Sequence, residues 1–297
     1  MATDRMSGME TFVHVVEAGS FSGAARLLDV GQPAVSKAIA QLEQRLGVRL
    51  LHRTTRGLTP TDAGQRFYAQ AKIAIDQVDA AELAARGSDG VLAGRLRVSA
   101  AVTFAGLHVI PLLKPFLAQH PQLDIDLVLD DRNVDLLAHG IDVALRLGDQ
   151  ADSRMTARRL GQARRMVVAT PAYLAQAGAP RSPAELAGKD LVVYDTREGG
   201  NVWTFTDAVG VMQSITLSGR IRTTAGEGIK AALMADLGLA IVSEWMIGPE
   251  LQQGRIKQVL ADWTLPALDL WAVFPAGRGA SPKARAFIGW LEQHLPR

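Results

Sequence analysis

The chain has 297 residues, 48% of them hydrophobic and 21% charged, and carries a formal net charge of +2 at pH 7. This length suits about two domains, and the composition excludes disordered and fibrous proteins. The small net charge excludes a protein that coats nucleic acid by charge alone. The absence of cysteine excludes disulfides and thiolate chemistry and fits a reducing cytoplasm. No apolar signal core opens the sequence, and the apolar stretch 100–113 is too short to span a bilayer, so we expect a cytoplasmic protein.

Three helices are predicted near the N-terminus from apolar residues at helical spacing. They are Met9, Phe12, Val13 and Val16 in the first helix, Ala24, Ala25, Leu27 and Leu28 in the second, and Val35, Ile39, Leu42 and Leu46 in the third. The break at 29–31 ends in a glycine that can take a positive φ or act as an N-cap, and Pro33 suits the first turn of a helix. The spacing therefore predicts a helix-turn-helix whose second helix begins near Gln32.

The start of that second helix carries side chains suited to a DNA major groove. Gln32, Ser36 and Lys37 are expected to be exposed. Glutamine can pair with adenine through two hydrogen bonds, serine and lysine can reach bases or phosphates, and the surfaces of Pro33 and Ala34 can meet a thymine methyl group. A helical hairpin inside an enzyme would show the same apolar spacing, so this pattern alone leaves both interpretations open.

The next stretch favours DNA binding. After Gly47, two short β-prone pieces flank residues 54–57, and a hairpin there would project Arg53 and Arg56 as a wing.

At this point the sequence resembles the LysR-type transcriptional regulators. The matching residues are Phe21-Ser22-x-Ala24-Ala25, Gln32-Pro33-Ala34-Val35-Ser36, Gln41-Leu42-Glu43, Leu46-Gly47-Val48-Arg49-Leu50, Arg53-Thr54 and Thr61-x-Ala63-Gly64. Two positions depart from the family pattern: Gly31 stands where Ser or Thr is usual, and Leu51-His52 where Phe and a polar residue are common. Glycine is a tolerated N-cap, so the first departure should cost only a few tenths of a kcal/mol.

A long helix is predicted after the wing, with Thr59 as its cap, Pro60 in its first position and its end near Arg86. The helix could cover its own subunit as a connector. The resemblance implies instead that it pairs with its mate in a homodimer, and that dimers join through their effector domains into a tetramer. The apolar stripe expected to mediate dimerisation consists of Phe67, Ala71, Ile75 and Val78.

The remaining chain alternates strand and helix patterns, which predicts an α/β layout with a mostly parallel sheet. The first run comprises strand Arg95–Ser99, helix His108–Gln119, strand Asp124–Leu129, a helix near Asn133–His139 and strand Ile141–Leu147. The second begins at Met166 and includes a β-rich piece at 202–223, helix Glu227–Asp236, strand Leu239–Ser243, strand Leu268–Phe274 and helix Pro282–His294.

The resemblance implies an overall α/β fold with a winged helix-turn-helix, a linker helix and a two-lobed α/β effector domain like a periplasmic binding protein. The expected boundaries are 1–60 for the DNA-binding domain, 61–90 for the linker helix and hinge, and 91–297 for the effector domain. Lobe 1 would hold 91–163 and 268–297, and lobe 2 would hold 164–267. The chain would cross between them near Gln162–Arg164 and Pro266–Ala267.

Polar residues follow several predicted strands, and ligands of two-lobed α/β domains bind beyond the carboxyl ends of strands. Ser99, Ala100 and Thr103 follow the first strand, and Arg146 supplies a guanidinium that fits a carboxylate. The second lobe would add Thr196, Asn201, Trp203 and Thr224. Each alone has a structural explanation, but together with the resemblance they predict a small organic anion, held by Ser99, Thr103 and Arg146.

The strongest sign of an enzyme is Gly226-x-Gly228-x-x-Ala231, which matches a dinucleotide-binding fingerprint, with Glu244 near the ribose-binding position. The resemblance implies that these glycines only start a helix at the cleft edge. No histidine pair has the i, i+4 spacing of a helical zinc site, no G-x-S-x-G elbow occurs, and the pairs Asp124/Asp126 and Asp130/Asp131 are interpreted as solvated. We expect no catalytic residue, metal or cofactor.

The sequence therefore predicts a DNA-binding transcriptional regulator whose C-terminal part senses a small molecule. Its expected partners are double-stranded promoter DNA, the effector, a second copy of the chain and, for an activator, RNA polymerase. A regulator that needs no ligand and a nicotinamide-dependent enzyme are the alternatives.

Overall fold

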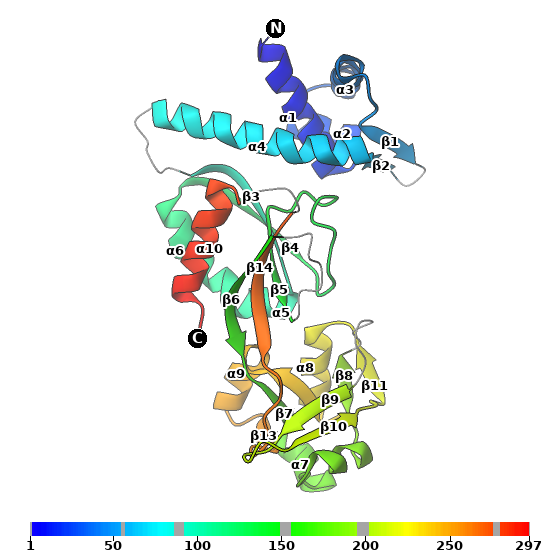
Figure 1. Cartoon of the computed structure of the whole chain (residues 1–297), viewed down its shortest axis with the longest axis vertical. Helices are drawn as coiled ribbons and strands as arrows, with labels where there is room; N and C mark the ends of the chain where they lie inside the picture. The colour runs from blue at the N-terminus through cyan, green and yellow to red at the C-terminus, as the bar shows by residue number, and fades with distance from the viewer. Residues whose placement is uncertain are drawn as a thin grey trace.

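The computed structural model describes residues 2–54, 57–85, 92–148, 156–194, 202–275 and 280–296. Three bodies follow one another along the long axis (Figure 1). A helical head lies at one end, a body built on a five-stranded sheet (lobe 1) lies in the middle, and a body of smaller sheets (lobe 2) lies at the other end.

The head contains the three predicted helices, α1 (Ala2–Ala18), α2 (Phe21–Leu27) and α3 (Gln32–Leu46), followed by the antiparallel strands β1 (Leu51–Thr54) and β2 (Gly57–Pro60). Its core is formed by apolar residues that the helical spacing had selected, among them Phe12, Val13, Val16, Ala24, Ala25, Val35, Ile39 and Leu42. The helix-turn-helix prediction is confirmed. Leu27 and Leu46 are the last residues of α2 and α3 and are 51% and 38% exposed.

The long helix α4 (Asp62–Ala85) begins later than predicted. Thr59 and Pro60 pair with β1, and Thr61 is the cap, because its Oγ1 accepts a hydrogen bond from the Gly64 N–H at 2.9 Å. Part of the apolar stripe is covered within the same chain, as in the connector interpretation. The Phe67 ring packs edge-on against Phe12 at 5.4 Å and Ala71 is 2% exposed, because α4 lies across α1 (Figure 1).

Lobe 1 is built on a mixed sheet of order β4-β3-β5-β14-β6. The strands are β3 (Ala93–Ala100), β4 (Gln122–Leu129), β5 (Val143–Leu147), β6 (Thr156–Ala163) and β14 (Leu268–Phe274). β3 is parallel to β4 and β5, whereas β14 is antiparallel to both β5 and β6. The prediction of a mostly parallel sheet therefore holds for three strands only, because β6 and β14 are the strands that connect to the other lobe.

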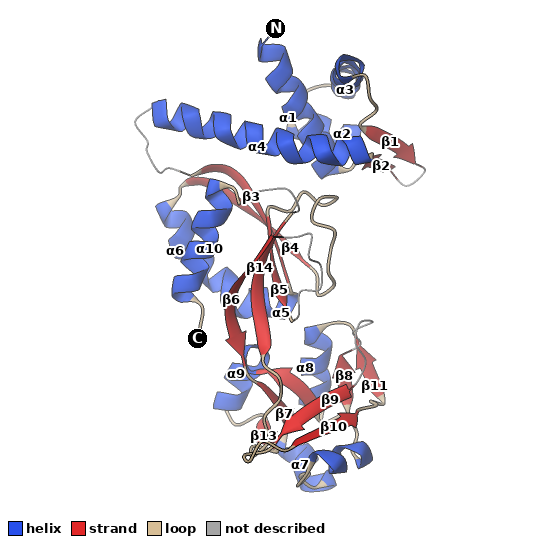
Figure 2. Cartoon of the chain, viewed as in Figure 1, coloured by secondary structure: helices blue, strands red, loops and turns tan. Residues whose placement is uncertain are grey.

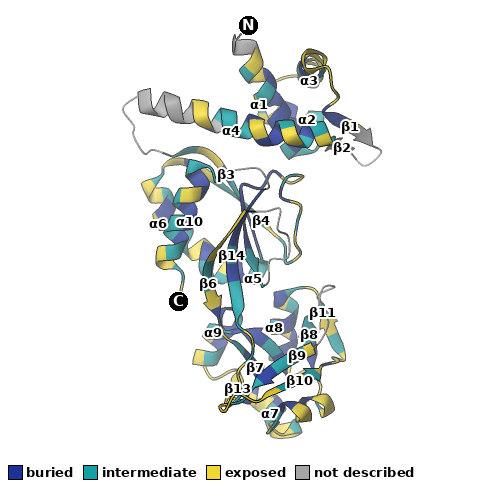
Figure 3. Cartoon of the chain, in the orientation of Figure 1, coloured by how far each residue is buried: buried dark blue, intermediate teal, exposed yellow. Residues whose placement is uncertain are grey.

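One helical stretch, α5 (Val102–Phe104), the π-helical turn η1 (Ala105–Val109) and α6 (Ile110–Gln119), packs with α10 (Pro282–His294) on the sheet. Figure 3 shows buried residues along β14 and exposed ones on α6 and α10. Within the described ranges, Val102–Gln119 is the one helix long and apolar enough to cross a membrane by composition, but its Phe104, Val109 and Phe116 lie in the lobe 1 core.

The helix predicted near Asn133–His139 is absent. The chain makes turns there, because the Asp135 carboxylate accepts hydrogen bonds from the N–H groups of Leu137 and Ala138, and Gly140 has a φ of +64°. A side chain that satisfies the backbone locally competes with helix formation.

Lobe 2 contains three small sheets, β12-β7-β13, β8 with β11, and β9 with β10 (Figure 2). The strands are β7 (Arg165–Ala169), β8 (Val192–Tyr194), β9 (Val202–Thr206), β10 (Met212–Thr216), β11 (Ile221–Thr223), β12 (Ala240–Ser243) and β13 (Lys257–Val259). The helices are α7 (Pro171–Ala177), the 3-10 turn η2 (Pro183–Gly188), α8 (Gly226–Met234) and α9 (Glu244–Gln252). Between the lobes, the Arg165 guanidinium donates to the carbonyls of Pro266 and Ala267 at 3.0 and 3.1 Å and ties the two chain crossings together.

Candidate functional site

The turn between α2 and α3 leaves the first turn of α3 exposed to solvent. The Ser20 Oγ caps α2 by accepting from the Gly23 N–H at 3.0 Å, and Asp29, with a φ of +52°, makes the left-handed turn. Gly31 has a φ of −70° and is the N-cap of α3, so of its two predicted roles it has the second. Pro33 lies in the first turn, as predicted.

The first turns of α3 present one face to solvent and one to the core. Gln32, Pro33, Ala34 and Lys37 are exposed and Ser36 is half-buried. On the inner face Val35, Ile39 and Leu42 are 1–3% exposed, and they hold the helix on α1 and α2. A helix held by its inner face with its N-terminal turns free is suited to enter a DNA major groove.

The wing is fastened to α3 by Glu43. This carboxylate accepts hydrogen bonds from the N–H groups of Leu50 and Leu51 at 2.7 and 3.1 Å. The β1–β2 register pairs Arg53 with Leu58, so the predicted hairpin is present. Arg56 and the side chain of Arg53 lie outside the described residues.

The start of α4 is fixed to the same hairpin. The Thr61 N–H donates to the Leu50 carbonyl, and the Thr61 hydroxyl donates to the Arg49 carbonyl at 2.8 Å. A Cβ atom at Gly64 would lie 2.0 Å from the Leu50 carbonyl oxygen, so only glycine allows this approach. The Thr61-x-Ala63-Gly64 pattern therefore holds the start of the linker helix against the head.

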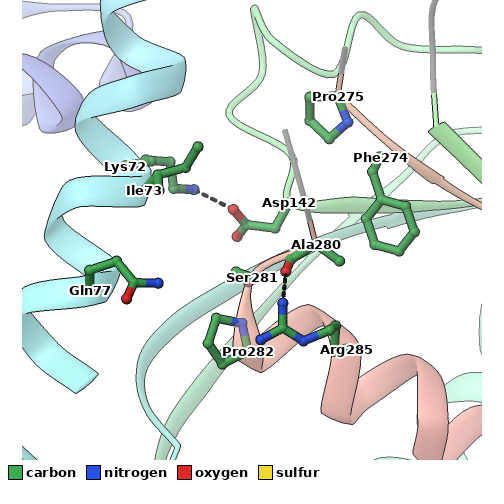
Figure 4. A pocket seen from close by; sticks show the side chains of 10 residues that line it. All are labelled: Lys72, Ile73, Gln77, Asp142, Phe274, Pro275, Ala280, Ser281, Pro282 and Arg285. Atoms are coloured by element: carbon green, nitrogen blue, oxygen red, sulfur yellow. Dashed lines mark hydrogen bonds and ion pairs between the residues drawn. The ribbon is translucent and has the colours of Figure 1, made fainter. Parts of the chain in front are cut away.

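An ionic network joins α1 and α4 to lobe 1. The Lys72 ammonium lies 2.8 Å from an Asp142 carboxylate oxygen and 3.2 Å from Glu17, and the Tyr68 hydroxyl donates to Glu17 at 3.0 Å. Burial alone would lower the pKa of Lys72, but the negative charge of Asp142, with smaller contributions from Tyr68 and Glu17, raises it above its ordinary value. Figure 4 shows Lys72 and Asp142 facing each other beside a cavity of about 200 Å³ between α4 and the start of α10.

In the effector part, the carboxyl ends of β3, β4 and β5 lie at one edge of the lobe 1 sheet, because these strands are parallel neighbours. Residues from this edge contact lobe 2 directly. Thr103 donates from its hydroxyl to Glu227 Oε1 at 2.6 Å, and the Asp131 carboxylate accepts from the Gly226 N–H at 2.6 Å. The interpretation of Asp131 as solvated was therefore wrong, because the carboxylate, which follows β4, is hydrogen-bonded to the other lobe.

The other predicted effector residues differ in their burial and in their contacts. Ser99 is 5% exposed on β3, the Arg146 guanidinium donates to the Val134 carbonyl at 3.0 Å, and Thr224 is exposed before α8. The Ala100 side chain lies in the lobe 1 core, and the partly buried Trp203 packs on the lobe 2 core with the Arg165 guanidinium 5.4 Å from its ring. Thr196 and Asn201 lie outside the described residues.

The glycines of the fingerprint have packing explanations. A Cβ at Gly226 would lie 2.8 Å from the Thr103 hydroxyl oxygen, and one at Gly228 would lie 2.2 Å from that of Thr223. Gly226 thus permits the close approach of the lobes, and Gly228 permits the packing of α8 on β11. These glycines start α8 at the edge of the cleft.

Two family models cover this architecture. The model of the bacterial regulatory helix-turn-helix protein of the lysR family matches residues 6–65, and that of the LysR substrate binding domain matches residues 89–296. The chain belongs to the LysR family of transcriptional regulators. It is 32% identical to the HTH-type transcriptional regulator CrgA of Neisseria meningitidis over 97% of this chain and 96% of that protein. It is 32% identical to DmlR of Escherichia coli over 98% and 94%.

Solved LysR-type structures agree over the full length. The CrgA structure from Neisseria meningitidis matches with a TM-score of 0.63 at 30% identity, covering 98% of this chain and 99% of that one. The Vibrio cholerae virulence activator AphB matches with a TM-score of 0.59 at 27% identity, covering 97% and 99%. The relatives named here are transcriptional regulators, which points away from an enzyme.

Sequence reasoning missed most of the residues that join the parts of this LysR-type chain. Thr103 was selected as an effector residue but Asp131 was not, although it follows β4, which is a parallel neighbour of β3, so the rule that selected Ser99 could also have selected Asp131. Glu227 lies directly after Gly226, the first glycine of the dinucleotide-binding fingerprint. The fingerprint interpretation rested on the glycines of this motif and not on the carboxylate between them. The partners of Lys72 lie in α1 and before β5, and no local pattern links these segments.

Proposed function

We propose that this LysR-type regulator reads specific promoter sequences with the start of α3. Gln32, Pro33, Ala34 and Ser36 would contact base edges, while Lys37, Arg53 and Arg56 would place positive charge against phosphates or an adjacent minor groove. The observation that carries the proposal is the exposed first turn of α3, held by the buried side chains of Val35, Ile39 and Leu42.

The proposed working form is a cytoplasmic homodimer paired through α4, with dimers joining into a tetramer. Two heads per dimer imply a roughly palindromic site. The proposed division is 1–60 for the head, 61–90 for the linker helix and hinge, and 91–297 for the effector domain with lobe 2 at 164–267. RNA polymerase is a proposed partner if the chain is an activator.

The proposed effector is a small organic anion that binds between the lobes near the ends of β3, β4 and β5. Hydroxyl and N–H donors gather there, among them the Thr103 hydroxyl and the N–H groups of Val102 and Gly226. Such donors hold carboxylates well. Ser99 and Arg146 lie on the strands that lead to this edge.

Footprinting on the DNA upstream of the chain's own and adjacent genes tests the proposal. Protection of a roughly palindromic segment is expected, and protection that does not depend on sequence contradicts it. A thermal-denaturation screen against organic acids and NAD(H) then separates the alternatives. Stabilisation by an organic acid supports the sensor, stabilisation by NAD(H) alone supports an enzyme, and no stabilisation favours a regulator without a ligand.

A further inference from the structure

Asp131, a carboxylate of the chain itself, lies where the two lobes touch and accepts hydrogen bonds from both. Its Oδ1 accepts from the Val102 N–H of lobe 1 at 2.8 Å, and its Oδ2 accepts from the Gly226 N–H of lobe 2 at 2.6 Å. Burial, together with the negative charge of the nearby Asp131 carboxylate, raises the pKa of the Tyr194 hydroxyl at the end of β8. Two N–H donors, one from each lobe, therefore converge on one side chain.

These contacts are those that a bound carboxylate ligand would make. One backbone N–H group donates to each of the two oxygens, and hydrogen bonds to an ionised acceptor are about twice as strong as neutral ones. The neighbouring Asp130 behaves differently, because its oxygens accept from the exposed Arg132 of the same lobe. The two residues are adjacent in sequence, yet among the described residues only Asp131 of the two accepts a hydrogen bond from lobe 2.

The lobes are packed closely around Asp131. Thr103 donates to Glu227 beside it, and a Cβ at Gly226 would lie 2.8 Å from the Thr103 hydroxyl and 3.6 Å from an Asp131 oxygen. An acidic group can therefore reach these donors only if the Asp131 carboxylate leaves them. Domains joined by two strands can open by hinge motion, and the closed form persists while its contacts outweigh the freedom gained on opening.

We propose that Asp131 is an internal ligand that latches the two lobes together, and that an acidic effector regulates the chain by displacing it. The second half rests on the proposed function, whereas the latch needs neither DNA nor effector. Binding would exchange one carboxylate for another and release the segment after β4.

The latch can be tested by an interlobe distance. The chain has no cysteine, so Gln119→Cys in lobe 1 and Gln252→Cys in lobe 2, both at exposed positions, take one spin label each. With the labelled chain diluted into an excess of unlabelled chain, so that each assembly holds one labelled copy, the pulsed electron resonance distance should form one narrow peak. Asp131→Ala should broaden the peak and shift it to longer distance, and sodium acetate should restore it by refilling the donors. Sodium chloride at equal ionic strength should not.

Asp130→Ala is the matched control, since it removes the same charge one residue away and should leave the peak unchanged. A native peak in Asp131→Ala, or a shifted peak that acetate does not restore, overturns the proposal. If Asp131→Ala does not fold, Asp131→Asn carries the test, and an unshifted peak there overturns it. Absence of a promoter footprint would count against the proposed function but would leave this measurement valid.

Discussion

The Lys72 ammonium on α4 lies 2.8 Å from the Asp142 carboxylate at the start of β5 and also contacts Glu17 of α1. The side chains of Lys72 and Asp142 are only 12% and 6% exposed, so this ion pair is shielded from water. Asp142 is further held by the Arg97 N–H at 2.9 Å. The pair therefore connects the head and linker helix to the sheet whose strand ends form the cleft.

Lys72→Met should destabilise the chain by about 3–5 kcal/mol, because it leaves two buried carboxylates without their cation. The pKa of Lys72 is raised in the folded chain, so its contribution is fully present below the unfolded value of about 10.4 and is lost only as the pH rises through the folded value. The free energy of unfolding, measured in urea, should differ between the wild type and Lys72→Met by the same amount from about pH 6 to about pH 9. Arg220→Met, which removes the exposed partner of Asp190, should cost at most about 1 kcal/mol. Equal effects of the two variants would contradict the buried role of Lys72.

Glu250 in lobe 2 should make stability depend on pH in the acidic range. Burial alone would raise its pKa, but the hydrogen bond from Lys230 and the positive charges of Lys230 and Arg255 lower it. A lowered pKa gives stability that is present above the unfolded value of about 4.3 and lost as the pH falls through the folded value. Glu250→Gln should therefore cost about 1.5–3 kcal/mol at pH 7, and the difference should shrink in acid. Urea unfolding across this range, with the exposed Glu10→Gln as control, checks it; a difference independent of pH would refute the assignment.

Gly64→Ala should cost about 3 kcal/mol, the upper end for overpacking, because the new Cβ would lie 2.0 Å from the rigid Leu50 carbonyl oxygen. Gly289→Ala in α10 is the matched helical control, since in the described part of the chain an added Cβ there would meet no heavy atom within 4 Å outside its own turn of helix. It should stabilise by about 0.5–1 kcal/mol. Thermal unfolding of both variants checks this prediction. If Gly64→Ala is as stable as the wild type, α4 is not held against the hairpin as described.

The sequence predicted best where one element repeats a simple pattern. The bounds of Leu268–Phe274 and Pro282–His294 agree with the structure, because an apolar strand and a helix with Ser281 as its cap leave little choice. It failed where a long-range contact decides. The packing of Ala71 in the head core and the hydrogen bond from the Gly226 N–H to Asp131 both join segments that lie far apart in the sequence. The turn at Asp135 was mistaken for a helix because the side-chain capping that replaces it has no periodic signature.

Val78 is the sharper probe of the proposed dimer, because it is 42% exposed whereas Phe67 packs on Phe12 of the same chain. Val78→Asp should weaken dimerisation about tenfold or more, a loss of about 1.4 kcal/mol, by placing a charge in an apolar interface. Val209→Asp, on a lobe 2 residue that is 84% exposed, should leave it unchanged. Sedimentation of both variants over a concentration series checks the prediction, and a stable wild-type monomer at micromolar concentration would contradict it.

Reading of DNA by the start of α3 is tested most directly by the ratio of affinities for the footprinted site and for random DNA, measured by fluorescence anisotropy over a salt series. Gln32→Ala should lose about 1–3 kcal/mol on the cognate site and little on random DNA, so the ratio should fall. Lys37→Ala is the matched variant on the same exposed turns. It should weaken both complexes alike. The slope of the logarithm of the binding constant against the logarithm of the salt concentration should become shallower by about one, as expected for the loss of one phosphate contact. If Gln32→Ala keeps the wild-type ratio, α3 does not read the bases in this way and the central claim is contradicted.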